Sequence, residues 1–221
     1  MAAATEADPQ SLAGPVQSEE EFRIVAQEQR YSKYLTLYNC RVRYPLKNGL
    51  TAYEEHEYDV IGHPQAGFHF TATFPFHPYG HGRKGGEVTI LREYCQGVNQ
   101  MLYSLPAGGF DPKKHQTYLE CAQAELSEEA HLQGGEWLEL LDPAHPGISE
   151  VKWCKNRFTP FLCISPEADC TPGIRDVEEF IEVKRLDLEE VRRLALSGDM
   201  LTPSIVTCFM AFDRLQKLGH L

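Results

Sequence analysis

The chain has 221 residues, 42% of them hydrophobic, which is enough to build the core of one domain with a small additional unit. Its formal net charge of −11 argues against non-specific binding of nucleic acid, which needs a basic surface. No apolar run is long enough to span a membrane. The seven cysteines form no Cys-x-x-Cys pair and no signal peptide precedes them, so we expect reduced thiols in a cytoplasmic protein.

The N-terminal part of the chain divides into a leader and a β-rich unit. Residues 1–18 contain no aromatic residue, Lys or Arg, and we expect them to be disordered. Residues 19–62 predict an antiparallel β unit. In it, residues 33–44 have strand composition, Asn48-Gly49 is a hairpin turn signal, and residues 51–61 would be the return strand. A hairpin alone is marginally stable, so the unit must pack on the main domain or on another subunit.

The remaining residues, 63–221, predict a main domain of strands and helices. Its strands are expected at residues 68–74, 87–94, 101–105, 136–141, 153–164 and 179–183. Two helices are expected to begin at Asp187 and Thr202, and the second has an apolar face. Four histidines precede or lie near the first of these strands, but the spacing of His63, His69, His77 and His81 matches no standard metal site.

A glycine loop followed by an acidic helix is the most informative stretch. Pro106-Ala107-Gly108-Gly109 breaks regular structure, and Thr117 with Glu120 three residues later is a capping-box start. Apolar residues then recur at helical spacing as far as Leu132, and Gly134-Gly135 is the expected stop.

Three carboxylates share one face of this helix. Glu125, Glu128 and Glu129 are spaced i, i+3 and i+4, and like charges at that spacing cost about 0.2–0.5 kcal/mol per pair. A hard divalent cation bound by oxygen ligands would reverse that penalty.

The loop and helix together resemble the signature of the Nudix hydrolase family. That signature is a glycine loop and then a helix bearing Arg-Glu-apolar-any-Glu-Glu-any-Gly-apolar, and here the helix reads Ala124-Glu125-Leu126-Ser127-Glu128-Glu129-Ala130-His131-Leu132. The three metal-binding glutamates match. The signature's Arg is replaced by Ala124, its Gly by His131, and its loop glutamate falls near Lys114. The resemblance implies an α+β Nudix fold, a mixed β-sheet sandwiched between helices, and a Nudix pyrophosphohydrolase.

Other stretches are similar to the ADP-ribose and ADP-sugar (nucleoside diphosphate sugar) pyrophosphatases within this family. Arg92-Glu93-Tyr94-Cys95 looks like the subgroup's Arg-Gln-Tyr-Arg, with Cys95 in place of the second Arg. Ser104 stands where a Glu usually precedes Leu-Pro-Ala-Gly. The N-terminal β unit is similar to the one that builds a homodimer in that subgroup, although a hairpin that merely extends the sheet is an equal alternative.

The resemblance also implies roles for individual residues. Mg²⁺ or Mn²⁺ would be bound by Glu125, Glu128, Glu129 and the Ala107 carbonyl. Glu128 is a candidate base, and Glu167, in the acidic loop at residues 165–175, is a second candidate catalytic carboxylate. Arg92 and Gly108 would contact the substrate.

The implied reaction is metal-dependent hydrolysis of the pyrophosphate bond of ADP-ribose or an ADP- or UDP-sugar, which releases a nucleoside monophosphate and a sugar phosphate. The expected partners are this small molecule and a second copy of the chain, with no nucleic acid or membrane. Two alternatives remain open. Ala124 favours a catalytically impaired Nudix-fold module that binds a nucleotide or a protein. The second alternative is an unrelated α+β domain, in which the acidic face of the helix is only solvent-exposed surface.

Overall fold

A computed structural model of the chain describes residues 22–45, 53–175 and 180–221. The chain divides into two compact units, Met1–Ile61 and Gly62–Leu221. The leader expected at residues 1–18 and the turn expected at Asn48-Gly49 lie outside the described residues.

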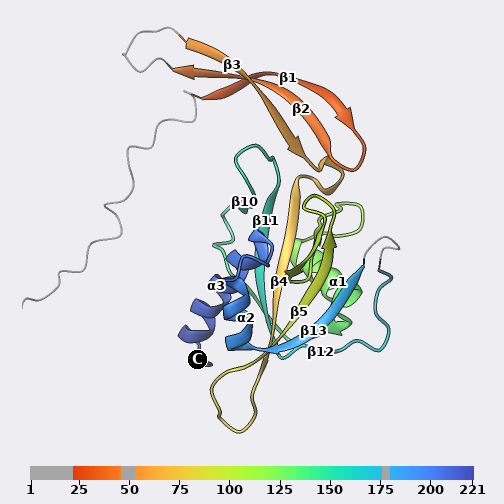
Figure 1. Ribbon diagram of the computed structural model, residues 1–221, viewed down its shortest axis with the longest axis vertical. Helices are drawn as coiled ribbons and strands as arrows, with labels where there is room; N and C mark the ends of the chain where they lie inside the picture. Colours follow the sequence, from red (N-terminus) through yellow and green to blue (C-terminus); the bar gives the residue numbers. More distant parts are fainter. Residues whose placement is uncertain (1–21, 46–52, 176–179) are drawn as a thin grey trace, which may run out of the picture. The chain divides into compact units, whose positions relative to one another are not determined.

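The first unit is a three-stranded sheet in the order β1-β2-β3 (Figure 1). Its strands are β1 (Arg23–Ser32), β2 (Thr36–Pro45) and β3 (Tyr53–Gly62). The unit therefore has one strand more than the hairpin that the sequence predicted. The sequence of β1 lacks the alternation of apolar and polar residues that marks a half-buried strand, and nearly every residue of the strand is exposed.

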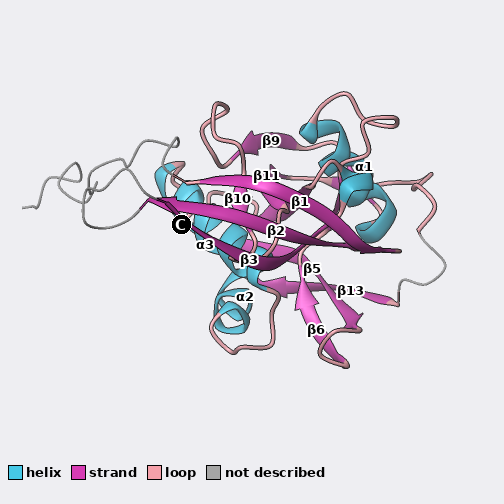
Figure 2. Cartoon of the chain, turned by 90° about the horizontal axis from the view of Figure 1, so that it is seen from above, coloured by secondary structure: helices cyan, strands magenta, loops and turns pink. Residues whose placement is uncertain are grey.

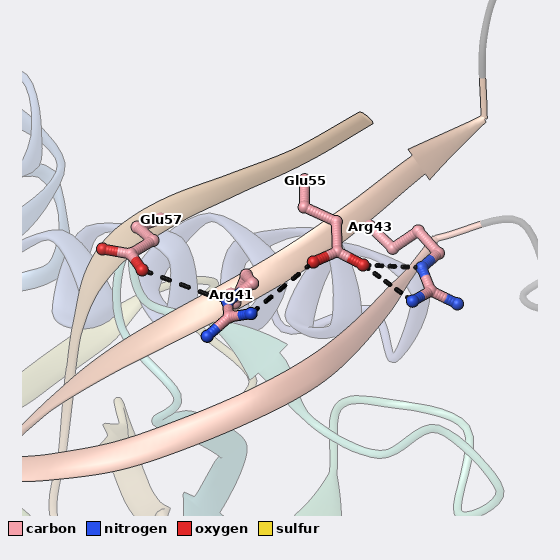
Figure 3. A network of polar contacts seen from close by, with 4 residues as sticks. All are labelled: Arg41, Arg43, Glu55 and Glu57. Atoms are coloured by element: carbon pink, nitrogen blue, oxygen red, sulfur yellow. Dashed lines mark hydrogen bonds and ion pairs between the residues drawn. The ribbon is translucent and has the colours of Figure 1, made fainter. Parts of the chain in front are cut away.

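Charged side chains of β2 and β3 form the network drawn in Figure 3. Two nitrogens of Arg43 lie 3.0 and 2.7 Å from one Glu55 oxygen, and Arg41 lies 3.8 Å from the other and 4.0 Å from Glu57. Exposed ion pairs contribute about 0–1 kcal/mol each, so the network adds little to the stability of this sheet.

The second unit contains a mixed eight-stranded sheet whose main path runs β10-β11-β4-β5-β13. Strand β4 pairs in parallel with β11 and antiparallel with β5, and the shorter strands β6, β7 and β9 pair with β5, β4 and β11. The bounds are β4 His69–Pro78, β5 Gly86–Cys95, β6 Gln100–Ser104, β7 Ala107–Gly109, β9 Glu136–Glu139, β10 Ile148–Ser149, β11 Arg157–Ile164 and β13 Ile181–Asp187. A separate two-stranded sheet joins β8 (Leu132–Gln133) to β12 (Glu167–Ala168), and a 3-10 turn covers Pro64–Ala66.

Helices cover both faces of the large sheet (Figure 2). Helix α1 (Tyr118–Ala130) packs on one face, where Leu126 and Ala130 join Leu91 and Cys163 in a small apolar cluster. Helices α2 (Leu188–Ala195) and α3 (Thr202–Lys217) pack on the other face over a larger apolar core. The prediction of an α+β sandwich of helices around a mixed sheet is confirmed.

None of the helices in the described part of the chain is long and apolar enough to cross a membrane.

Candidate active site

Helix α1 begins as the capping signal predicts. The Thr117 hydroxyl accepts a hydrogen bond from the Glu120 backbone N–H at 3.1 Å. The Glu120 carboxylate in turn accepts one from the Gln116 N–H at 2.6 Å. The first bond satisfies one of the free N–H groups in the first turn of the helix, and the second binds the residue that precedes the cap.

The predicted end of the helix is wrong. Helix α1 ends at Ala130, and His131 caps it in the left-handed conformation with φ 55° and ψ 42°. The chain turns there because the next two residues form β8, which pairs with β12. Gly134-Gly135 therefore lies beyond this strand and does not stop the helix. His131, which replaces the signature's Gly, adopts a backbone conformation that Gly takes more easily.

The glycine loop is held against the sheet beside this helix. Its first residues form β7, which pairs with the start of β4 in the register Phe70–Gly109, Thr71–Gly108 and Ala72–Ala107. The Thr73 N–H also donates to the Pro106 carbonyl at 2.9 Å. Strand β7 is thus a fixed piece of backbone rather than a free loop, and its contacts with α1 decide where the helix carboxylates lie.

Glu129 is bound to β7 through its carboxylate. The Glu129 side chain is only 6% exposed, and its Oε2 accepts a hydrogen bond from the Ala107 N–H at 2.8 Å. A hydrogen bond to a carboxylate is stronger than one between neutral groups. Ala107, which the resemblance assigns as a metal ligand through its carbonyl, therefore meets Glu129 through its N–H.

Glu125 lies one helical turn earlier and rests on the next residue of β7. A Cβ atom added to Gly108 would lie 2.0 Å from the Glu125 carboxyl carbon and 2.0 Å from its Oε1. The Glu125 carboxylate thus fills the space that a side chain at position 108 would need. Two of the predicted ligands, Glu125 and Glu129, are in this way brought to the Ala107–Gly109 strand.

The structure places the other two predicted carboxylates at a different backbone segment. A Cβ atom added to Gly173 would lie 2.3 Å from Glu128 Cγ, so Glu128 contacts the loop at residues 165–175. Glu167 in that loop is exposed and pairs through β12 with Gln133. Among residues 22–45, 53–175 and 180–221, no three His, Cys, Asp or Glu side chains are arranged to hold a metal ion.

Arg92 is not directed toward α1. Ile90 packs in the core beneath α2 and α3, whereas Leu91 packs with Leu126 of α1. Because side chains alternate along a strand, Arg92 shares the face of Ile90. Its guanidinium lies 3.4 Å from the Glu182 carboxylate on the neighbouring strand. The substrate role of Arg92 stays a prediction, and the structure gives this side chain an ion-pair partner of its own.

Comparisons with known proteins settle the family. The family model described as the NUDIX domain matches residues 81–203, more than half of the chain. The chain belongs to the Nudix family. The predicted enzyme class, a Nudix pyrophosphohydrolase, is thereby confirmed. A crystal structure described as an ADP compounds hydrolase aligns with a TM-score of 0.67 and 16% sequence identity, over 91% of this chain and 97% of that one, which confirms the Nudix fold. No curated protein sequence matches.

The donors of this Nudix site suit a hard divalent cation. Carboxylate and carbonyl oxygens are the ligands that Mg²⁺ prefers, and it is commonly held by one or two carboxylates plus the phosphates of a substrate. Glu125 and Glu129, both seated on β7, supply such a pair. A site of this kind needs no third protein side chain. The pair is therefore compatible with the finding that no three His, Cys, Asp or Glu side chains of the described residues form a metal site.

Two cysteines and two histidines on this side of the sheet are structural groups rather than nucleophiles or bases. Burial raises the pKa of the Cys121 and Cys163 thiols to about 12, so neither supplies a thiolate nucleophile. His69 and His77 each form a buried hydrogen bond with a threonine hydroxyl, at 2.8 and 2.9 Å. Burial is the main cause that lowers the pKa of both imidazoles, so they are neutral structural groups at neutral pH.

The loop at residues 165–175 contributes contacts that the sequence analysis missed. The Ser127 hydroxyl donates to Asp169 Oδ2 at 2.7 Å and accepts from the Gly173 N–H at 3.0 Å. The hydrogen bond from the Ser127 hydroxyl, with that from the Thr171 N–H, holds the pKa of Asp169 below its usual range. Arg175 donates to the backbone carbonyls of Glu129 and Ile181. Its signal in the sequence was its position as the single basic residue of an acidic loop.

Proposed function

We propose that this Nudix protein hydrolyses the pyrophosphate bond of a nucleoside diphosphate derivative in a reaction that depends on Mg²⁺ or Mn²⁺. ADP-ribose and ADP- or UDP-sugars are the proposed substrates, and a nucleoside monophosphate and a sugar phosphate are the products. The observation that carries the proposal is the seating of the Glu125 and Glu129 carboxylates on Ala107 and Gly108. An acidic protein that acts on an anionic substrate needs a cation between them.

Glu125 and Glu129 would hold the cation in this mechanism. When bound, the cation neutralises phosphate oxygens and lowers the pKa of the attacking water. The fixed strand β7 positions both carboxylates, so little reorganisation is needed when the substrate arrives.

A second carboxylate would take the proton from the attacking water. As the new bond forms from the water oxygen to phosphorus, the bridging oxygen leaves on the other phosphate and the proton passes to Glu128 or Glu167. Both belong to the C-terminal end of α1 and the loop that contacts it. The chain's contribution is therefore mainly positioning and charge, as in other phosphoryl transfers.

The substrate class rests on two likenesses. Arg92-Glu93-Tyr94 and Pro106-Ala107-Gly108 resemble the nucleoside diphosphate sugar pyrophosphatases. The similar crystal structure is described as an ADP compounds hydrolase. Cys95 in place of the subgroup's second Arg predicts a weaker hold on the diphosphate.

A phosphate-release screen tests this proposal. Wild-type protein would be given nucleoside diphosphate sugars, dinucleotides and nucleoside triphosphates with Mg²⁺, with Mn²⁺ and with EDTA. We expect the diphosphate sugars to be turned over fastest and EDTA to abolish turnover. A clear preference for triphosphates or for capped RNA would contradict the assignment.

A catalytically impaired module that binds a nucleotide or a protein is the second candidate. It is favoured by Ala124 in place of the signature's Arg, and by the contact of Glu128 with Gly173 of the loop at residues 165–175. Nucleotide binding by calorimetry, without turnover of any substrate in the screen, would identify this case.

We further propose that residues 19–62 are a dimerisation unit, that residues 63–221 are the hydrolase domain, and that the protein is a cytoplasmic homodimer. In the dimerisation unit, large apolar side chains are exposed on β1 and β3, among them Ile24 at 52%, Tyr31 at 60% and Tyr53 at 57%. An edge strand with such side chains is a template for pairing with another chain.

Light scattering over a dilution series would test the dimer. Ile24→Lys should shift the protein toward monomer, whereas Leu196→Lys, a matched change at another exposed apolar position on the hydrolase domain, should not. A wild-type monomer at micromolar concentration, with the β unit still folded by circular dichroism, would count against it.

A further inference from the structure

The last two turns of α1 are held by a single loop, residues 165–175. The loop contacts successive residues of the helix: Asp169 and Gly173 meet Ser127, and Gly173 lies against Glu128. The Asp169 N–H also donates to the carbonyl of His131, the helix cap, at 2.9 Å. The loop is therefore held at the end of the helix by polar contacts of its backbone and side chains.

Arg175 closes this set of contacts from the far end of the loop. Its Nη2 donates to the Glu129 carbonyl at 2.5 Å, and its Nη1 donates to the Ile181 carbonyl of β13 at 3.3 Å. One guanidinium thus ties the C-terminal turn of α1 to a strand of the large sheet. A planar guanidinium with donors in a fixed fork can bridge two acceptors in this way, which a Lys ammonium does less well.

The end of α1 needs such a group for two reasons. The carbonyls of the last helical turn have no partner within the helix, and the partial negative charge there favours a cation. Helix α1 has no basic residue in its last turn and instead carries Glu128 and Glu129 there. Arg175 therefore supplies, from another segment, the positive charge that the helix itself lacks.

We infer that Arg175 is a positioning residue of the proposed metal site. By holding the Glu129 carbonyl against β13, it sets where the Glu129 side chain meets the Ala107 N–H, and it keeps the acidic turn from fraying when no cation is bound. The inference rests on the proposed function, because it assigns the effect of Arg175 to the carboxylates that would hold the cation. Groups that support metal ligands in this way typically change metal affinity or activity about 10–100-fold when they are removed.

Arg175→Met removes the guanidinium and keeps most of the side chain's length. Binding of Mn²⁺ alone, measured by electron paramagnetic resonance, should weaken by about 10-fold or more. Amide hydrogen exchange in EDTA should accelerate in the peptide that covers residues 126–132, with little change elsewhere. Arg175→Lys, which keeps the charge but not the fork, should fall between Arg175→Met and wild type in both measurements.

Arg214→Met is the matched control. Arg214 lies on α3, across the sheet from α1, so the same loss of charge there should change neither Mn²⁺ affinity nor exchange at residues 126–132. The inference would be overturned if Arg175→Met bound Mn²⁺ as wild type does. It would also be overturned if that variant only lowered the melting temperature and exchange rose evenly across the chain.

The same experiment separates this inference from the proposed function. If Glu129→Gln binds Mn²⁺ as tightly as wild type, the proposed metal site fails, and with it the link from Arg175 to the cation. If Glu129→Gln loses Mn²⁺ but Arg175→Met does not, the proposed site stands and only the role of Arg175 is wrong.

Discussion

The two faces of the large sheet bury different kinds of side chain. Beneath α2 and α3 the buried side chains are almost all apolar and include Phe74, Phe76 and Ile90. On the α1 side the apolar cluster is smaller, and the alternation of side chains along the strands places buried polar residues on this face: His69, Thr71, His77, Thr89 and Thr159. The first face supplies most of the hydrophobic stabilisation, whereas the second uses buried surface for hydrogen bonds that orient groups. Substitutions on the two faces should therefore affect stability and activity differently.

The largest effect on stability is expected at Phe74, which is fully buried and packs edge-on against Phe212 of α3 with ring centroids 5.6 Å apart. Phe74→Ala should lower the free energy of unfolding by about 3–5 kcal/mol because it leaves a cavity. Urea denaturation would measure this. The kcat and KM of the folded fraction should stay near wild type, since the apolar face does not contact the carboxylates.

Phe209→Ala is the control for this substitution. Phe209 is on the same helix as Phe212 but is 42% exposed, so Phe209→Ala should lower the free energy of unfolding by much less than Phe74→Ala does. If Phe74→Ala lowered kcat without lowering stability, the claim that this face of the sheet affects stability rather than activity would be contradicted.

The next effect concerns His77 on the polar face. Burial, and then the charge of Arg185, lower the pKa of His77 from 6.5 to about 4. As pH falls from 6.5 toward 4, the unfolded chain takes up a proton that the folded chain does not, so the free energy of unfolding should fall by about 3 kcal/mol. Urea denaturation at several pH values would show this loss.

His77→Gln should remove most of that acid sensitivity, because a neutral amide can still bond the Thr89 hydroxyl. His56→Gln, a change at an exposed histidine of the first unit, should leave the pH dependence as in wild type. Equal acid sensitivity in His77→Gln and wild type would show that the buried imidazole is not its source. The lowered pKa of His69 also reduces the free energy of unfolding at acid pH, and it does so equally in wild type, His77→Gln and His56→Gln.

The third effect sharpens the comparison at the site itself. Gly108→Ala places a Cβ atom where the Glu125 carboxylate lies, so the carboxylate must move. A displacement of about 1 Å can cost about 10²-fold in rate, and we expect kcat/KM to fall about 100-fold with a small change in melting temperature.

Gly109→Ala is the neighbouring control. Its Cβ would lie 3.0 Å from the Cβ of Ala66 and would meet no carboxylate, so it should lower stability without a specific loss of kcat/KM. Equal kinetic losses in the two variants would mean that β7 matters only as packed backbone.

Local signals in the sequence predicted much of this arrangement. The Thr117–Glu120 cap, the strand content of β5 and the periodic apolar stripe of α1 each depend on residues a few positions apart, and the structure contains all three. The presence of Glu125 and Glu129 on one helix face follows in the same way from their spacing.

Contacts between distant segments were not readable from the sequence. The contact of Glu128 with Gly173 joins residues far apart in the chain, and the face that Arg92 occupies depends on the pairing of β5 with its neighbours. The end of α1 at Ala130 also depends on such pairing, because β8 turns away to meet β12. Local patterns do not encode these tertiary partners. The tertiary partners decide which of the predicted site residues share a surface.

The central claim is that Glu129 holds the cation that the reaction requires. The decisive measurement is hydrolysis of a nucleoside diphosphate sugar by Glu129→Gln and wild type at equal Mg²⁺, with Glu190→Gln on α2 as an exposed control. The account predicts a rate for Glu129→Gln at least about 10²-fold lower, since the charge stabilisation that is lost is commonly several kcal/mol.

Stability in EDTA should stay near that of wild type in the same variant. The amide oxygen that Glu129→Gln introduces can still accept from the Ala107 N–H, although more weakly than a carboxylate does. Relief of the repulsion with Glu125, about 0.2–0.5 kcal/mol, should offset that loss in the free energy of unfolding. If wild type hydrolyses the substrate and Glu129→Gln retains that rate at equal Mg²⁺, α1 does not hold the cation and the proposed mechanism is contradicted.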